Sequence, residues 1–125
     1  MKKDLALVYS TVPAVGAGVF TTSKVQAASM IVDIIQLKKS ETFRALVVNS
    51  GNACTGERGL NDAWAMTKAT AEELNIPEEH VLVSSTGVIG QYLLMEKISA
   101  GIHQAVTMLA FITTDVNSDR VVACV

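Results

Sequence analysis

Two short apolar runs, each ending in a polar loop that contains glycine, constrain the fold of this chain most. Residues 45–48 lead into the loop 49–52, and residues 81–83 lead into the loop 84–87. Short apolar runs bounded by turn-forming residues are typical of buried strands. A segment with helical spacing separates the two loops. The order strand, loop, helix, strand, loop therefore predicts an α/β fold.

The segment between the loops, residues 60–74, carries the clearest helical pattern in the chain. Its apolar residues fall on one stripe at 3.6-residue spacing: Leu60, Ala63, Trp64, Ala71 and Leu74. Asn75 is a residue type that ends helices in the left-handed conformation, and Pro77 opposes continuation. We therefore predict a helix that ends at Leu74.

The remaining elements follow from shorter patterns. Residues 5–9 predict a strand, and residues 16–20 a tight glycine turn into a second extended piece. Residues 27–37 fit either a buried strand or a helix. Residues 95–104 predict a helix, and residues 108–113 a further strand.

Composition restricts the surroundings and partners of the chain. Its residues are 50% hydrophobic and 18% charged, and this suggests strands buried on both faces or a surface covered by more protein. A net charge of −2 provides no basic field for nucleic acid. Met1-Lys2-Lys3 imitates the start of a signal peptide, but Asp4 and the polar residues 9–11 interrupt the apolar block that export requires. We expect a cytoplasmic protein that neither spans nor binds a membrane.

The loop after residues 81–83 offers donors for a negatively charged group. Thr86 adds a hydroxyl, and Gly87 allows a reacting group to approach the main chain. Backbone N–H groups held on a strand end suit a developing oxyanion. The alternative for this loop, and equally for residues 49–52, is a turn made of small residues.

Other chemistry lacks a recognisable pattern. His80 and His103 are isolated, with no partner at metal-ligand spacing, and the two cysteines, Cys54 and Cys124, form neither a disulfide framework nor a metal motif. The glycines match neither dinucleotide nor phosphate-loop spacing. We therefore expect no metal and no cofactor.

Several short motifs occur in this chain in the same order as in a known protein family. The matching segments are residues 17–22, 45–56, 59–63, 81–90, 95–98 and 101–102. Together they resemble the ornithine acetyltransferases, which are bifunctional glutamate N-acetyltransferases of arginine biosynthesis. The strings Asn-Ser-Gly-Asn (49–52) and Ser-Thr-Gly-Val-Ile-Gly (85–90) are the most specific, and the match covers nearly all of the chain from about residue 4.

This resemblance implies an architecture. Members of the family and the related self-processing aminopeptidases have layered sheets flanked by helices. Residues 1–125 would form a single, incomplete domain that supplies the N-terminal portion of that α/β fold, with an internal deletion. Because the family assembles from two copies of each processed chain, we expect a homo-oligomer or association with a missing C-terminal portion.

The resemblance also implies a mechanism. Family members cut themselves before a threonine, and residues 107–115 look like the sequence that begins there, which places the scissile bond at Val106–Thr107. Thr107 would take acetyl from N-acetylornithine as an ester and pass it to glutamate, with its freed α-amine as base. Thr86 and Gly87 match the oxyanion-hole pair. No coenzyme is needed, because the acetyl group stays on the enzyme.

The chain departs from the family pattern in three places. The loop 49–54 lacks an Ala-Asn pair that members usually carry. The long lysine- and glycine-containing segment expected between Ile102 and Val106 is missing, and Val106 replaces the usual alanine. Only residues 107–125 follow the matched cleavage site, whereas the family's second chain is far longer.

A second alignment is possible for the end of the chain. Residues 112–115 also resemble a Thr-Thr-Asp string upstream of the family's cleavage site, where a threonine contacts substrate; here this would be Thr114. In this alignment Thr107 is an ordinary helix or strand residue.

Three functions follow from these readings. The chain is an acetyltransferase of this family that uses Thr107, Thr86 and Gly87, or it is an inactive, truncated member with only a binding or assembly role. Composition alone also allows a small α/β binding module of unrelated function.

Overall fold

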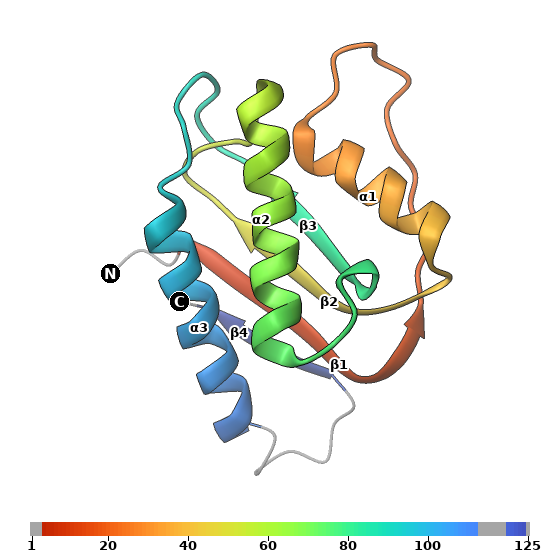
Figure 1. Ribbon diagram of the computed structural model, residues 1–125, viewed down its shortest axis with the longest axis vertical. Coiled ribbons are helices and arrows are strands. Elements are labelled where there is room, and N and C mark those ends of the chain that lie inside the picture. The colour runs from red at the N-terminus through yellow and green to blue at the C-terminus, as the bar shows by residue number, and fades with distance from the viewer. Residues whose placement is uncertain (1–3, 113–119, 125) are drawn as a thin grey trace.

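A four-stranded mixed sheet with three helices on one face forms the part of the chain described by the computed structural model (Figure 1). The structure describes residues 4–112 and 120–124, with side chains for residues 4–109. The strands lie in the order β3-β2-β1-β4; β2 and β3 are parallel, and β1 is antiparallel to β2 and β4. This arrangement confirms the predicted α/β class. The strands are β1 (Leu5–Val15), β2 (Thr42–Asn49), β3 (Val81–Ser85) and β4 (Arg120–Cys124).

Residues 27–37, whose sequence fits either a strand or a helix, belong almost entirely to helix α1 (Ala28–Lys39). Ala28, Val32 and Gln36 recur every four residues, and all three are buried. The amide nitrogen of Gln36 donates to the carbonyl oxygens of Glu78 and Val81, at 2.7 and 3.3 Å. A helix therefore buries this face and also satisfies the polar group on it.

Helix α2 (Gly56–Leu74) confirms the predicted helix and begins one turn earlier. Asn75 follows it with a φ of 52°, the left-handed conformation expected of the terminator, and its N–H donates to the carbonyls of Ala71 and Glu72. A single 3₁₀ turn (Glu78–His80) then leads into β3. The predicted strands at residues 5–9, 45–48 and 81–83 correspond to β1, β2 and β3.

Helix α3 (Met95–Ile112) shows that the strand predicted at residues 108–113 is wrong over its described part. Ile102, Ala105 and Leu109 are buried at spacings of three and four residues, so the helical face continues through the apolar run. A short apolar run cannot by itself distinguish strand from buried helix. Val19, which the sequence placed in a second extended piece, lies outside the described strands, and its side chain is 100% exposed.

The two faces of the sheet differ in their covering. Alternate residues of β2 and β3, including Val47, Val81 and Val83, are buried against the helices. The side chains between them point to the other face, which we call the open face: Val8, Leu46, Val48 and Leu82, all partly exposed. None of the described helices covers the open face (Figure 1). The core therefore lies in one layer between sheet and helices.

Asp33 of α1 connects this helix to the edge of the sheet. Its carboxylate oxygen Oδ1 accepts a hydrogen bond from the Val83 N–H at 2.8 Å. Burial raises the pKa of Asp33 from 3.8 to about 6, although the Val83 hydrogen bond acts in the opposite direction. The folded state therefore binds a proton at Asp33 at a pH where the unfolded chain has lost it.

Stability should depend on pH through this carboxyl group. Its contribution is fully present below about pH 3.8 and is lost as the pH rises through about 6, because the charged form is disfavoured by burial. Asp33→Asn keeps an oxygen acceptor for Val83 and removes the charge. We expect this variant to unfold at higher urea concentration than the parent chain at pH 7.5, and to lose the corresponding pH dependence. Glu41→Gln, at an exposed position, is the control. A less stable Asp33→Asn chain at pH 7.5 would contradict this account.

Candidate functional site

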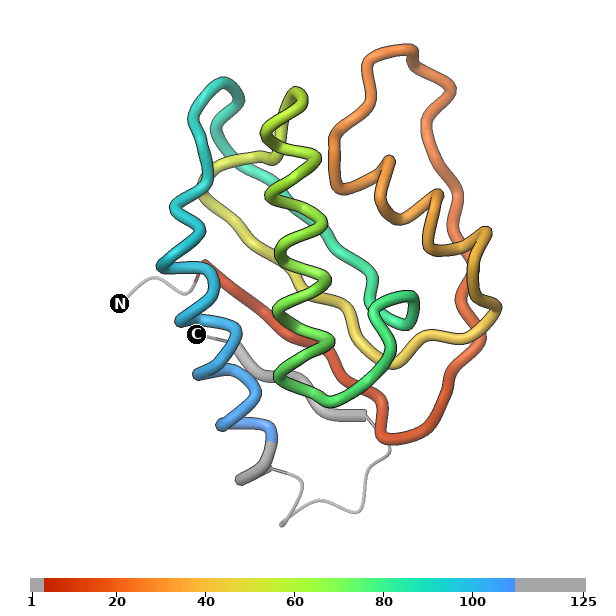
Figure 2. Tube along the Cα trace, in the orientation of Figure 1, coloured from red at the N-terminus to blue at the C-terminus, as the bar shows by residue number. Residues whose placement is uncertain are grey.

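The parallel pairing of β2 and β3 brings the two glycine loops to the same edge of the sheet (Figure 2). Asn49 and Ser85, the last residues of the two strands, are register partners. Beyond them the loops continue to pair: the Thr86 N–H donates to the Asn49 carbonyl at 3.1 Å, and the Val88 N–H to the Gly51 carbonyl at 2.8 Å. The loops therefore form one backbone-bonded unit rather than two independent turns.

Gly87 is required by this contact between the loops. Its φ is +131°, and a Cβ atom there would lie 2.1 Å from the Gly51 carbonyl oxygen and 2.8 Å from the Asn52 nitrogen. No side chain larger than hydrogen fits between these backbone atoms without separating the loops. The sequence suggested that a glycine here allows a reacting group to approach the main chain. The structure shows that the close packing of the two loops also requires glycine at this position.

Two hydrogen-bond donors of the second loop face solvent. Thr86 and Gly87 are both exposed. Among the described residues, neither the Thr86 hydroxyl nor the Gly87 N–H makes a hydrogen bond, while the Thr86 N–H is held by Asn49. A fixed backbone with adjacent free donors is the arrangement that an oxyanion requires. Their role as an oxyanion pair stays a prediction.

Ser85 and Cys54 have structural rather than chemical roles in this arrangement. The Ser85 hydroxyl accepts a hydrogen bond from the Cys54 N–H at 2.9 Å and lies 3.3 Å from the Asn52 carbonyl, to which it donates. The Cys54 side chain is buried, and burial raises the pKa of its thiol. A buried thiol with a raised pKa is a poor nucleophile.

Thr107 lies inside helix α3, away from the start of the helix that follows the second loop. It is twelve residues beyond Met95, which is about 18 Å along the helix axis. The Thr107 hydroxyl donates to the His103 carbonyl at 3.0 Å, and Val106 packs partly buried against the core. The Val106–Thr107 bond is thus a helical peptide bond, and the nitrogen of Thr107 is an amide.

This position bears on the two alignments of the chain end. A nucleophilic Thr107 would require α3 to open at Val106, whereas the second alignment expects an ordinary helix or strand residue there. The structure does not bring Thr107 next to Thr86 and Gly87. Its assignment as nucleophile stays a prediction, and Thr114 lies outside the described residues.

The histidines lie apart from the loops. The His103 ring nitrogen Nδ1 is 3.0 Å from a Glu73 carboxylate oxygen on the exposed sides of α3 and α2. Within residues 4–112 and 120–124, no three acidic, histidine or cysteine side chains gather as a metal site would require. In the same part of the chain, no helix combines the length and apolar character needed to cross a membrane.

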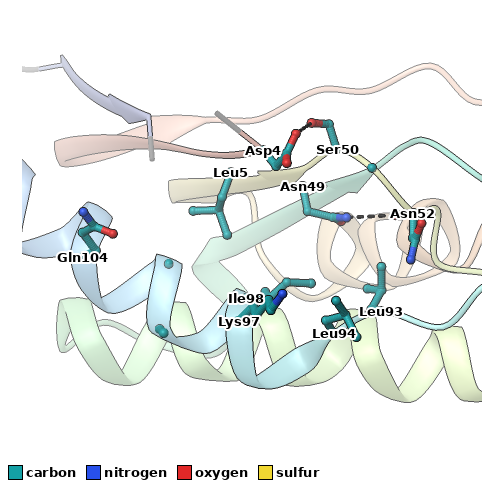
Figure 3. Close-up of a pocket in the computed structure, with 13 residues that line it drawn as sticks. Asp4, Leu5, Asn49, Ser50, Asn52, Leu93, Leu94, Lys97, Ile98 and Gln104 are labelled. Carbon is teal, nitrogen blue, oxygen red and sulfur yellow. Dashed lines mark hydrogen bonds between the residues drawn. The ribbon is translucent and has the colours of Figure 1, made fainter. Parts of the chain in front are cut away.

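A groove beside the first loop was not predicted from the sequence. It lies between the start of β1, residues 49–52 and α3, and has a volume of about 550 Å³ (Figure 3). Asn49 lines it and is only 3% exposed, and its side-chain oxygen Oδ1 has no hydrogen-bond partner among the residues that the structure describes. The sequence shows that Asn49 is a polar residue at the end of an apolar strand. This pattern does not show that its side chain is buried.

Comparison with known proteins identifies relatives across nearly the whole chain. The model of the ArgJ family matches residues 1–124. The arginine biosynthesis bifunctional protein ArgJ of Thermotoga neapolitana is 54% identical over 112 residues, which cover 87% of this chain and 28% of that protein. The Bacillus subtilis protein of the same name is 53% identical, covering 82% of this chain and 26% of its own length. This chain therefore spans about a quarter of the length of these curated relatives.

Solved structures agree with the sequence comparison. The ArgJ protein of Bacillus halodurans superposes with a TM-score of 0.78 at 46% identity, covering 82% of this chain and 56% of that chain. An ornithine acetyltransferase of Mycobacterium tuberculosis, solved in complex with ornithine, gives 0.77 at 38% identity, covering 83% and 57%.

The contact between the loops predicts unequal effects of two glycine substitutions. Gly87→Ala should lower the free energy of unfolding by about 2–3 kcal/mol, because its Cβ would collide with the Gly51 carbonyl at a positive φ. Gly90 also has a positive φ, +86°, but a Cβ atom there would have no atom within 4 Å. Gly90→Ala should therefore cost only the backbone strain of about 1 kcal/mol. Urea denaturation of both variants measures the difference. Equal losses would show that the loops do not depend on this contact.

Proposed function

Because this chain belongs to the ArgJ family, we propose that it supplies the oxyanion-binding part of a glutamate N-acetyltransferase site in arginine biosynthesis. The reaction transfers acetyl from N-acetylornithine to glutamate through an acetyl-threonine ester. In the first step a threonine oxygen attacks the acetyl carbonyl, and ornithine leaves with a proton on its amine. In the second step the glutamate amine attacks the ester, and the threonine oxygen recovers its proton.

The observation that carries this proposal is the pair of free donors at Thr86 and Gly87. In each step the acetyl carbonyl oxygen becomes negatively charged in a tetrahedral intermediate. The Thr86 hydroxyl and the Gly87 N–H are adjacent and exposed, and their loop is held by backbone hydrogen bonds to Asn49 and Gly51. Donors that are fixed before the reaction stabilise this charge without reorganisation.

The identity of the nucleophile separates the two alignments. The helical peptide bond at Val106–Thr107 supports the second alignment, in which the threonine nucleophile belongs to a region of the relatives that this chain does not span. The same observation favours, for the chain alone, the alternative of an inactive family member with a binding or assembly role. In both cases Thr86 and Gly87 keep the positions described above.

The open face supports association with further protein. This face of the sheet carries four apolar side chains that are partly exposed: Val8, Leu46, Val48 and Leu82. We propose that the rest of an ArgJ enzyme, or a second copy of the chain, covers this surface. Burying apolar area in this way would stabilise the assembly.

Mass spectrometry distinguishes the two alignments. We expect the purified chain to keep its intact mass, because the scissile bond of the first alignment lies within a helix that contacts the core. Thr107→Ala should give the same result, with little change in stability because Thr107 is exposed. A fragment that begins at Thr107 in the parent chain, and disappears in Thr107→Ala, would establish the first alignment instead.

A chimera tests the role of Thr86 in the reaction. This chain replaces the matching region of the Thermotoga neapolitana protein, and acetyl transfer from N-acetylornithine to glutamate is measured. Thr86→Ala should lower kcat by about 10²–10³-fold, as expected for loss of one oxyanion donor. Thr55→Ala is the matched control, since Thr55 precedes α2 and its side chain makes no capping hydrogen bond.

Two outcomes would count against the proposal. If Thr86→Ala and Thr55→Ala have the same kcat, Thr86 is not an oxyanion donor. If the chimera folds and shows no transfer, the inactive alternative is favoured.

A further inference from the structure

The proposed oxyanion donors begin an exposed segment, residues 86–92, that follows β3 and leads toward α3. Every residue of this segment is exposed, so packing against the core does not hold it. Gly87 and Gly90 have positive φ angles of 131° and 86°, and glycine leaves the backbone many alternative conformations. Donors that must be fixed before the reaction therefore need other contacts to hold this segment.

Backbone hydrogen bonds hold the beginning of the segment. The Val88 N–H donates to the Gly51 carbonyl at 2.8 Å, and the Val88 carbonyl accepts a hydrogen bond from the Ala53 N–H at 2.9 Å. Both polar groups of the Val88 backbone are thus paired with the first loop. A turn at residues 89 and 90 follows, and the chain then reaches Tyr92.

Two further contacts meet at Tyr92, the last residue of the segment. The side-chain nitrogen Nδ2 of Asn52 donates to the Tyr92 carbonyl at 3.0 Å. The Arg58 guanidinium, from the first turn of α2, lies over the Tyr92 ring, with its Cζ atom 3.9 Å from the ring centroid. Figure 1 shows the start of α2 and the segment after β3 at the same end of the molecule. We call these two contacts the Tyr92 clamp.

The clamp accounts for the positions of both side chains in the stack. The Tyr92 side chain is 64% exposed, so the core does not fix its ring. Arg58 is exposed and forms no ion pair with another described residue. A guanidinium is attracted to the face of an aromatic ring, and this attraction orders both groups. The segment is therefore held at its beginning by Val88 and at its end by the clamp.

We propose that Asn52 and Arg58 are positioning residues that hold Tyr92 and thereby keep the donors of Thr86 and Gly87 in place. Neither residue is assigned a contact with the acetyl group. The catalytic part of this inference rests on the proposed function. It also gives a role to the Asn-Ser-Gly-Asn string, since Asn52 is its last residue.

Hydrogen exchange of the ¹⁵N-labelled chain, followed by NMR, tests the clamp without the reaction. The Val88 amide exchanges only when its hydrogen bond to Gly51 opens. Arg58→Met and Tyr92→Leu remove the stack, and we expect either to speed this exchange about two- to fivefold. Asn52→Ala should speed it about fivefold, because one hydrogen bond is lost. Tyr92→Phe keeps the ring and should exchange like the parent chain.

Kinetics of the chimera with the Thermotoga neapolitana protein test the catalytic consequence. Oxyanion donors act in the transition state, so Arg58→Met and Tyr92→Leu should lower kcat about two- to fivefold and leave KM unchanged. Tyr92→Phe should keep the kcat of the parent chimera. Lys68→Met, which removes an exposed cation further along α2, is the matched control and should also keep it. Circular dichroism gives the folded fraction by which each rate is corrected.

The proposal is overturned if Arg58→Met and Tyr92→Leu leave the exchange of Val88 unchanged. It is also overturned if they raise KM at constant kcat, or leave kcat unchanged in a chimera in which Thr86→Ala lowers it. Failure of the proposed function gives a different result, because Thr86→Ala then keeps the parent kcat. If the chimera shows no transfer, the exchange of Val88 alone decides whether the clamp holds the segment.

Discussion

The parallel pairing of β2 with β3 is the constraint on which the site depends. Parallel strands end at the same edge, and here the backbone pairing continues past the strand ends through Asn49 and Thr86. Helix α2 connects the two strands across one face and leaves both loops at that edge. The position of every proposed donor follows from this pairing. Gly87 preserves it by allowing the two backbones to approach each other.

The sequence predicted those elements whose signals are local. The stripe of α2 and its terminator Asn75 depend on neighbouring residues, and both are confirmed. The segment that forms α1 stayed ambiguous because its side chains suit either a strand or a helix. The helix is favoured by hydrogen bonds from the buried Gln36 side chain to two carbonyls that are distant in sequence. The strand expected at residues 108–113 was wrong because contacts of Leu109 with the core continue the helical face.

The candidate site was predictable only in part. Thr86 and Gly87 could be selected because a hydroxyl and a glycine follow a buried strand. The strand register then places Thr86 beside Asn49 and Gly87 beside Gly51. The assignment of Thr107 as nucleophile depended on a choice between two short alignments, and residue types alone do not distinguish them. The groove was not predicted because residues distant in sequence, such as Asn49 and Lys97, line it together only through the packing of α3 against the sheet.

The hydrogen bond from Val83 to Asp33 has a consequence for how this sheet meets other molecules. Among the described strands β3 is an edge strand, and an edge strand with free N–H groups can recruit a strand from another chain. The carboxylate occupies one of these groups at the middle of β3. Growth of the sheet by addition of a foreign strand is therefore obstructed on this side, at the expense of holding a carboxyl group where its ionisation is disfavoured.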